Sequence, residues 1–278
     1  MSGTLSIQPN ERVTFRIRHE DDSLIVVQKR SGLVTQPGIG HQHDTLLNGL
    51  FAHCGEMLQN LGAARDFGLV HRLDGETSGL LVVAKRGRAY DHLREQFAER
   101  SVRKFYWAIS HKAPRDTEGV IKRPIEEVVK RNSRYTSTKT AKLVSSGKPA
   151  VTAYRVLDSN YNAALIEARP VTGRLHQVRV HLASIGCAVL GDAHYGPKSV
   201  NNASHRLALH SHRLCFTHPE TGEAMDFRTS WPQDLKKILG RVGLARPDLA
   251  DADGSPDEGS AHDGTHEVGG DPVGEQES

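Results

Sequence analysis

The stretch from Val70 to Lys85 joins a polar, glycine-bearing loop directly to an uninterrupted apolar run. The run, Leu80 to Ala84, lacks the apolar–polar alternation of a half-exposed strand and is typical of a strand buried on both faces. The loop before it reads His-Arg-Leu-Asp-Gly-Glu-Thr-Ser-Gly and carries Asp74. We therefore expect Asp74 to be held rigidly at the end of a buried strand, which favours a catalytic role over that of a solvated surface carboxylate.

The rest of the body alternates short apolar runs with polar turns. Period-two alternation or short apolar runs predict strands at residues 13–17, 24–27, 105–110, 151–156 and 163–168, and a hairpin within 216–227. Helical spacing of apolar residues predicts helices at 87–100, 175–185 and 232–239. Many strands with a few helices in irregular order indicate an α+β domain with a mixed sheet.

Charge is unevenly distributed along the chain. Residues 247–278 hold ten of the 33 Asp and Glu and none of the 36 Lys and Arg, so residues 1–246 carry a net charge of +13. A basic body indicates a polyanionic partner, most simply nucleic acid; a basic protein without such a partner is the alternative. The acidic tail is rich in Gly and Ser, and we expect it to be disordered.

We divide the chain into an extension of residues 1–12, one domain of residues 13–245 and an acidic tail of residues 246–278. No apolar stretch reaches the length of a membrane span, and the N-terminus lacks the pattern of a secretory signal. Cys54, Cys187 and Cys215 form no CxxC pair, which argues against disulfides and zinc. We expect a cytoplasmic monomer.

The region from Pro114 to Lys148 is basic and poor in apolar residues. It contains the clusters Lys130 to Arg134 and Lys139 to Lys142. We predict an exposed loop or hairpin that grips phosphates, with an ordinary solvated face as the alternative.

A further segment, residues 170–182, combines Arg174, His176, Gln177 and Arg179 at the start of a predicted helix. Arg179 is adjacent to the apolar side of that helix, where a buried arginine requires an acid. Asp74 is the partner we predict for it. His176 and His181 are five residues apart, not the four that let two histidines share a metal on one helix face.

Taken together, these segments resemble the RluA family of RNA pseudouridine synthases. The resemblance covers residues 19 to 239 and rests on several short matches, namely His71-Arg72-Leu73-Asp74 through Leu80, Lys104-x-Tyr106-x-Ala108, Thr172-Gly173-Arg174-x-His176-Gln177-x-Arg179, Gly191-Asp192, Tyr195-Gly196 and Arg206-Leu207. The chain departs from the family pattern at Lys29-Arg30 and at Cys187-Ala188, which affects the expected shape of two loops. Too few residues precede the body for an S4-type RNA-binding domain, so we expect substrate choice to rest on the body.

The resemblance implies a largely antiparallel central sheet with flanking helices and loops, and an active-site cleft across it. It also implies that Asp74 is the nucleophile, that Tyr106 packs against the target base and that Arg179 pairs with Asp74. The remaining residues of the matched segments are then candidates for substrate binding: His71, Arg72, Thr77, Arg174, His176 and Gln177.

The implied reaction converts a uridine in large-subunit rRNA or tRNA to pseudouridine, with no cofactor and no metal. The base is expected to flip into a pocket, and Arg72 to fill the vacated space or hold a phosphate. Asp74 either attacks C1′ or abstracts the C2′ proton, and Tyr106 is a candidate for removing the C5 proton. The rival interpretations are a non-catalytic RNA-binding protein and a glycosidase-like hydrolase, for which Glu76 would be the second carboxylate.

Overall fold

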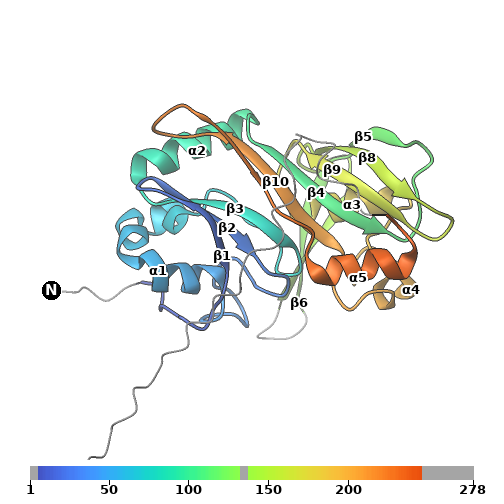
Figure 1. Cartoon of the computed structure of the whole chain (residues 1–278), viewed down its shortest axis with the longest axis horizontal. Helices are drawn as coiled ribbons and strands as arrows, with labels where there is room; N and C mark the ends of the chain where they lie inside the picture. The colour runs from blue at the N-terminus through green and yellow to red at the C-terminus, as the bar shows by residue number, and fades with distance from the viewer. Residues whose placement is uncertain (1–5, 132–136, 246–278) are drawn as a thin grey trace, which may run out of the picture. The chain divides into compact units, whose positions relative to one another are not determined.

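The computed structural model describes residues 6–131 and 137–245, and its centre is a nine-stranded sheet (Figure 1). Eight strands follow the order β1-β2-β3-β10-β4-β9-β8-β5, and β11 pairs with β10. Their bounds are β1 Arg16–Glu20, β2 Leu24–Lys29, β3 Ser78–Ala84, β4 Arg103–Ser110, β5 Glu118–Lys122, β8 Val151–Ser159, β9 Ala164–Pro170, β10 Leu209–Thr217 and β11 Ala224–Arg228. All pairings but one are antiparallel, so the prediction of a mixed, largely antiparallel sheet is confirmed.

The exception is the parallel pairing of β3 with β10, which joins the two halves of the sheet. Every residue of β3 is buried, as the apolar run predicts. Gly79 pairs with Ser211 there at a φ of 126°, and a Cβ atom at Gly79 would collide with the Ser211 backbone. Only glycine fits at this point, which lies immediately after the loop that carries Asp74.

The helices flank the sheet. In Figure 1, α1 (Leu46–Leu61) and α2 (Gly87–Glu99) lie beside β1 to β3, and α3 (Gln177–Ser184), α4 (Lys198–Asn202) and α5 (Gln233–Val242) lie on the side of β4 and β9. A short 3-10 helix, η1 (Ala63–Gly68), follows α1. The sequence predicted α2, α3 and α5 but not α1. Its first turn is closed by a reciprocal capping box between Thr45 and Asn48 that the sequence reading did not recognise.

Several predicted boundaries differ from the structure by two or three residues, and two of these differences have a clear local cause. The first strand begins at Arg16 rather than at residue 13, because Val13 is buried against Gly49 of α1 before the strand starts. Helix α3 begins at Gln177 rather than at residue 175, because His176 adopts a left-handed backbone with a φ of 51°. That conformation cannot continue a right-handed helix toward the N-terminus.

The basic region forms β5 and a separate hairpin of β6 (Ile125–Arg131) and β7 (Ser137–Leu143). The predicted hairpin is present, but its base is not simply exposed: Ile125 and Ala141 pack with Ala150 and Val180 in a small apolar cluster. Residues 132–136, which include part of the first basic cluster, lie outside the described residues, as do residues 246–278, for which we predicted disorder. Within the described part of the chain, no helix has the length and apolar character required to cross a membrane.

Candidate active site

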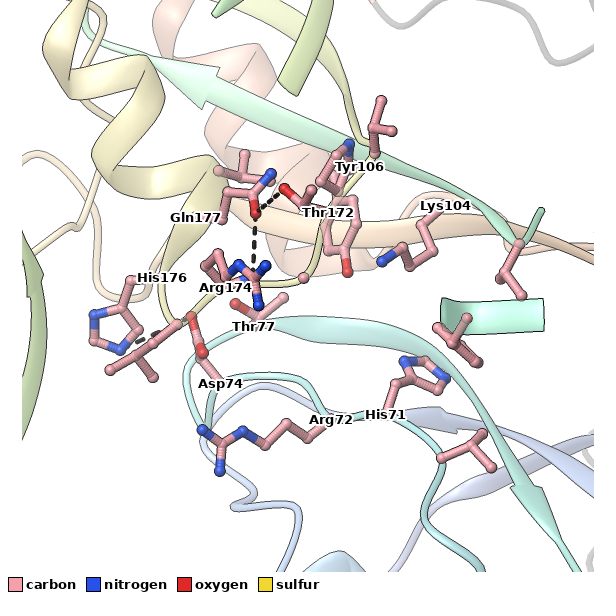
Figure 2. A pocket seen from close by; sticks show the side chains of 18 of the residues that line it. His71, Arg72, Asp74, Thr77, Lys104, Tyr106, Thr172, Arg174, His176 and Gln177 are labelled. Atoms are coloured by element: carbon pink, nitrogen blue, oxygen red, sulfur yellow. Dashed lines mark hydrogen bonds and ion pairs between the residues drawn. The ribbon is translucent and has the colours of Figure 1, made fainter. Parts of the chain in front are cut away.

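A cavity of about 590 Å³ lies where three segments meet, and Figure 2 shows its principal side chains. These segments are the loop at residues 71–77, strand β4, and the loop at residues 171–176 together with the first turn of α3. The cavity is therefore assembled from three of the segments that the sequence singled out: those that carry Asp74, Tyr106 and Arg179. Six cationic side chains line it: Arg72, Arg94, Arg100, Lys104, Arg174 and Arg179.

The loop that carries Asp74 is held by a buried lysine. The ammonium of Lys29 donates to the carbonyl oxygens of Leu33 at 2.6 Å, Gly75 at 3.1 Å and Arg30 at 3.1 Å. Burial lowers the pKa of Lys29 to about 7, and the charge of Asp74 acts in the opposite direction. Lys29 thus fastens the residue after Asp74 to the end of β2.

Two hydroxyl groups hold the same loop from other sides. Thr35 donates to the Leu73 carbonyl at 2.7 Å, and Ser31 donates to the Glu76 carbonyl at 2.6 Å. With its backbone held on both sides, Asp74 keeps a fixed position while its side chain remains 22% exposed toward the cavity. This arrangement suits a group that must reach substrate without rearranging.

Arg179 lies behind Asp74 and is almost fully buried. Its Nη1 lies 3.6 Å from Asp74 Oδ2, so the predicted pair is present, but the shortest contacts of Arg179 are with Asp192. Nε and Nη2 each donate to that carboxylate at 2.9 Å, and Nη2 also lies 3.1 Å from Glu76 Oε2. Burial lowers the pKa of Arg179, but Asp192, Asp74 and Glu76 together raise it above its usual range. Three carboxylates therefore share one permanent cation.

Glu76 was the second carboxylate of the hydrolase interpretation. In the structure it turns to the same guanidinium as Asp74, so the two acids lie on one cation. A glycosidase requires two carboxyl groups that flank the scissile bond. Glu76 instead forms an ion pair with Arg179 and helps to compensate the charge of that buried arginine.

His176 lies beside Asp74, with Nε2 3.9 Å from Asp74 Oδ2. The Tyr195 hydroxyl accepts a hydrogen bond from the Ala141 amide at 2.8 Å and lies 2.8 Å from His176 Nδ1. We assign the Tyr195 proton to the bond with Nδ1, which leaves the imidazole proton on Nε2, facing Asp74. Burial lowers the pKa of His176 to about 4 despite the charge of Asp74, so the ring is neutral at pH 7.

Gln177 is buried, and its amide is fully engaged within the protein. Its oxygen accepts from the Thr172 hydroxyl at 2.7 Å and the Arg174 amide at 3.0 Å. Its nitrogen donates to the Val151 carbonyl and the Thr152 hydroxyl, both at 2.9 Å. Gln177 was predicted to bind substrate, but these four bonds give it a different task, which is to hold the loop that carries Arg174.

Tyr106 projects from β4 into the cavity and is 8% exposed. Burial raises the pKa of its phenol above the usual range, and Asp74 raises it further. The side chain is therefore a neutral phenol at physiological pH. A neutral ring suits packing against a base, whereas proton removal would require a phenolate that this environment disfavours.

His71 also borders the cavity, but its ring is occupied by contacts with other residues of the protein. Its ring stacks on Phe97 at 4.8 Å between centroids, and Nε2 accepts the Val82 amide at 3.0 Å. Burial, with a smaller contribution from Lys104, lowers the pKa of His71 to about 3. This neutral ring ties the start of the Asp74 loop to β3, which is a structural role rather than the predicted substrate contact.

The remaining predicted binding residues face the cavity. Arg72 is exposed at the rim, and Arg174 is half-buried with Nε donating to the Pro149 carbonyl at 3.2 Å. Thr77 is 2% exposed, and its hydroxyl has no hydrogen-bond partner among the described residues. The Thr77 amide donates to the Asp74 carbonyl oxygen at 3.1 Å, which places this threonine in the same turn as the carboxylate.

Among the described residues, no group of three or more His, Cys, Asp or Glu side chains is arranged so that it could hold a metal ion. Cys54, Cys187 and Cys215 are free thiols.

Two residues were important to the site but were given no role from sequence. Asp192 stood in a matched Gly-Asp pair, yet nothing local linked it to Arg179 thirteen residues earlier in the chain. Lys29 was noted only because Arg30 follows it. The sequence does contain a signal for Lys29: a lysine at the end of an apolar strand indicates a buried ammonium group, which needs hydrogen-bond acceptors nearby.

Comparisons with known proteins agree with this geometry. Residues 23–184 match the family described as RNA pseudouridylate synthase. Ribosomal large subunit pseudouridine synthase D of Zymomonas mobilis is 41% identical over 236 residues, which cover 82% of this chain and 72% of that protein. The uncharacterized RNA pseudouridine synthase YlyB of Bacillus subtilis is 38% identical over 229 residues, which cover 82% and 73% of the two chains.

A solved structure, human RNA pseudouridylate synthase domain containing 4, superposes with a TM-score of 0.64 at 27% identity, covering 83% of this chain and 94% of that one. Human RNA pseudouridylate synthase domain containing 1 gives a TM-score of 0.61 at 25% identity, covering 85% and 98%. The fold, the family match and the relatives agree, and this chain belongs to the RluA family of RNA pseudouridine synthases, which are isomerases.

Proposed function

We propose that the enzyme isomerises uridine in large-subunit ribosomal RNA and that Asp74 is the residue that reacts with the target nucleotide. The RNA class is supported by the relative from Zymomonas mobilis, which is named for the large ribosomal subunit. The net charge of +13 on residues 1–246 suits a polyanionic substrate. Transfer RNA is the alternative substrate.

The observation that carries the proposal is the contact between Asp74 and Arg179 at the wall of the cavity. The buried cation faces the Asp74 carboxylate and orients it, and a carboxylate is the group that either attacks C1′ or abstracts the C2′ proton. Tyr106, also lining the cavity, offers a neutral ring on which a flipped uracil stacks.

The roles of the other cavity residues follow from their exposure. Arg72 and Arg174 present guanidinium groups at the mouth of the cavity, where the phosphates beside a flipped nucleotide would pass. Thr77 and His176 lie closer to Asp74 and would contact the ribose or base. Gln177 and His71 act on the substrate only through the loops that they hold.

The test compares wild-type protein with Asp74→Asn on transcribed large-subunit rRNA and on total tRNA. We expect wild type to form pseudouridine in the rRNA, and Asp74→Asn to bind the same RNA with unchanged affinity but to form none. Product from Asp74→Asn would overturn the role of Asp74. Product in tRNA alone would overturn the choice of RNA, and free uracil would favour the hydrolase.

A further inference from the structure

The structure buries three lysines to 8% exposure or less, and they differ in what surrounds the ammonium. Lys29 donates to three carbonyl oxygens, and Lys85 contacts Glu20 Oε1 and the Asp21 carbonyl, both at 2.7 Å. Lys104 has neither a hydrogen bond nor an ion pair with any residue that the structure describes. Only one of the three buried ammonium groups thus lacks an acceptor within the described protein.

The surroundings of Lys104 are uncharged. Its Nζ lies 5.6 Å from the centre of the Phe97 ring, and a Cβ built on Gly173 would lie 3.7 Å from it. Burial and the charge of Lys104 lower the pKa of His71, which is a neutral ring. Burial lowers the pKa of Lys104 to about 8, so it still carries its proton at pH 7. A desolvated cation without a counter-group is costly, and the structure leaves it open to the cavity.

The position of Lys104 relates it to the target base. Lys104 and Tyr106 are two residues apart on β4, so their side chains share one face of the sheet. Figure 2 shows the Lys104 ammonium turned toward the Tyr106 ring, with Asp74 on the other side of that ring. A uracil stacked on Tyr106 with its C1′ at Asp74 would direct its ring toward Lys104.

Phosphate is a poorer ligand for this lysine. The phosphates of a flipped nucleotide stay near the surface of the protein, where Arg72, Arg94 and Arg100 are all exposed along the cavity rim. Lys104 is 8% exposed and lies among Phe97, His71 and Tyr106. Depth and an uncharged lining favour a heterocyclic ring over a phosphate at this position.

We infer that Lys104 donates hydrogen bonds to the uracil ring as that ring becomes an anion during cleavage of the glycosidic bond. This inference rests on the proposed function. When the C1′–N1 bond breaks, its electron pair passes to N1 and spreads over the O2 and O4 oxygens. Meanwhile either the Asp74 carboxylate forms an ester bond to C1′, or C2′ loses its proton to Asp74 and a C1′–C2′ double bond forms. Lys104 keeps its own proton and stabilises the anion electrostatically until C5 bonds to C1′. That step releases Asp74 from C1′, or takes the proton of Asp74 back onto C2′, and the C5 proton is then lost to solvent while N1 gains one.

The experiment uses two RNAs that differ in one atom: the target uridine or 5-fluorouridine at the same position. Fluorine withdraws electrons, so the 5-fluorouracil anion needs less stabilisation when it leaves. Single-turnover rates of glycosidic cleavage are measured with saturating enzyme for wild type and for Lys104→Met. For uridine RNA we expect a loss of about 10²–10³-fold, as for removal of one donor to a developing anion. For 5-fluorouridine RNA we expect the loss to be roughly tenfold smaller.

Two controls accompany the measurement. Lys104→Arg, which keeps the charge, should recover part of the uridine rate. Arg100→Gln removes a cation from the rim and should weaken the binding of both RNAs equally, without any dependence on fluorine. Melting temperatures confirm that each variant is folded.

Equal losses on the two RNAs would overturn the inference, because a residue that only packs or positions does not respond to the leaving group. Weakened RNA binding with an unchanged rate at saturation would also overturn it and would assign Lys104 to a phosphate. Absence of product from wild type would instead refute the proposed function itself.

Discussion

Arg179 binds Asp192 through two hydrogen bonds of 2.9 Å, whereas its shortest distance to Asp74 is 3.6 Å. Asp192 is fully buried and also accepts the backbone amides of His194 and Tyr195. The guanidinium is therefore fixed from behind by one carboxylate and presents its remaining nitrogen to another. Because Asp192 compensates most of the charge of Arg179, Asp74 is oriented by the arginine but remains free to react.

Asp192→Asn should destabilise the protein and reduce its activity. The amide keeps the shape of the side chain but leaves Arg179 with much less compensation for its buried charge, at a cost of about 3–5 kcal/mol. Chemical denaturation measures the stability, and single-turnover pseudouridine formation measures the activity. Asp91→Asn, which removes an exposed partner of Arg65, is the matched control and should change neither. A fully stable Asp192→Asn protein would show that the bidentate pair is unimportant.

Lys29→Met should impair catalysis even though Lys29 binds only backbone carbonyl groups of the protein. The methionine fills the buried space but leaves the Leu33 carbonyl oxygen without its donor, at about 1–3 kcal/mol for a buried unpaired group, and leaves the Gly75 carbonyl with the Gly32 amide alone. The loop that carries Asp74 then loses one of its attachments to the end of β2. We expect a lower rate at saturating RNA with little change in RNA affinity. A change confined to affinity would contradict a positioning role for Lys29.

Tyr195→Phe should loosen the connection between the β6–β7 hairpin and the active site. The substitution removes the only hydroxyl found to join the Ala141 amide to His176 in the described residues. Backbone amide exchange near Ala141 should become faster, and the rate of pseudouridine formation should fall because His176 loses its orientation. Unchanged exchange at Ala141 with a normal rate would argue that the hydroxyl is dispensable.

Stability should decrease as the pH falls below about 6.5. Burial lowers the pKa of His71 to about 3 and that of His176 to about 4, while both titrate normally in the unfolded chain. Between these values the unfolded chain binds more protons than the folded protein, so lowering the pH favours unfolding. Denaturation at pH 7 and pH 5 measures the difference. His71→Gln keeps an acceptor for the Val82 amide but cannot titrate, so its pH dependence should be weaker than that of wild type. An identical dependence would contradict the assignment.

Much of the fold followed from local patterns. The apolar run at Leu80 to Ala84 predicted the buried strand β3, and helical spacing predicted α2. Helix α1 was missed because its capping box was not recognised and glycines interrupt its sequence. The start of α3 was placed two residues early because a left-handed His176 leaves no trace in apolar spacing.

The sequence by itself determined which groups we propose this protein uses: Asp74 in its loop, Tyr106 on a strand, Arg179 in a helix and a basic body. These conclusions depend on residue types and short spacings, which are local properties of the chain. Only the tertiary structure decided how the groups share their contacts. It gave Arg179 its main partner in Asp192, turned Glu76 to the same cation, engaged Gln177 and His71 within the protein, and left Lys104 buried without an acceptor in the described residues. Such contacts join segments far apart in sequence, and the cost of burying charged and polar groups determines which of them pair.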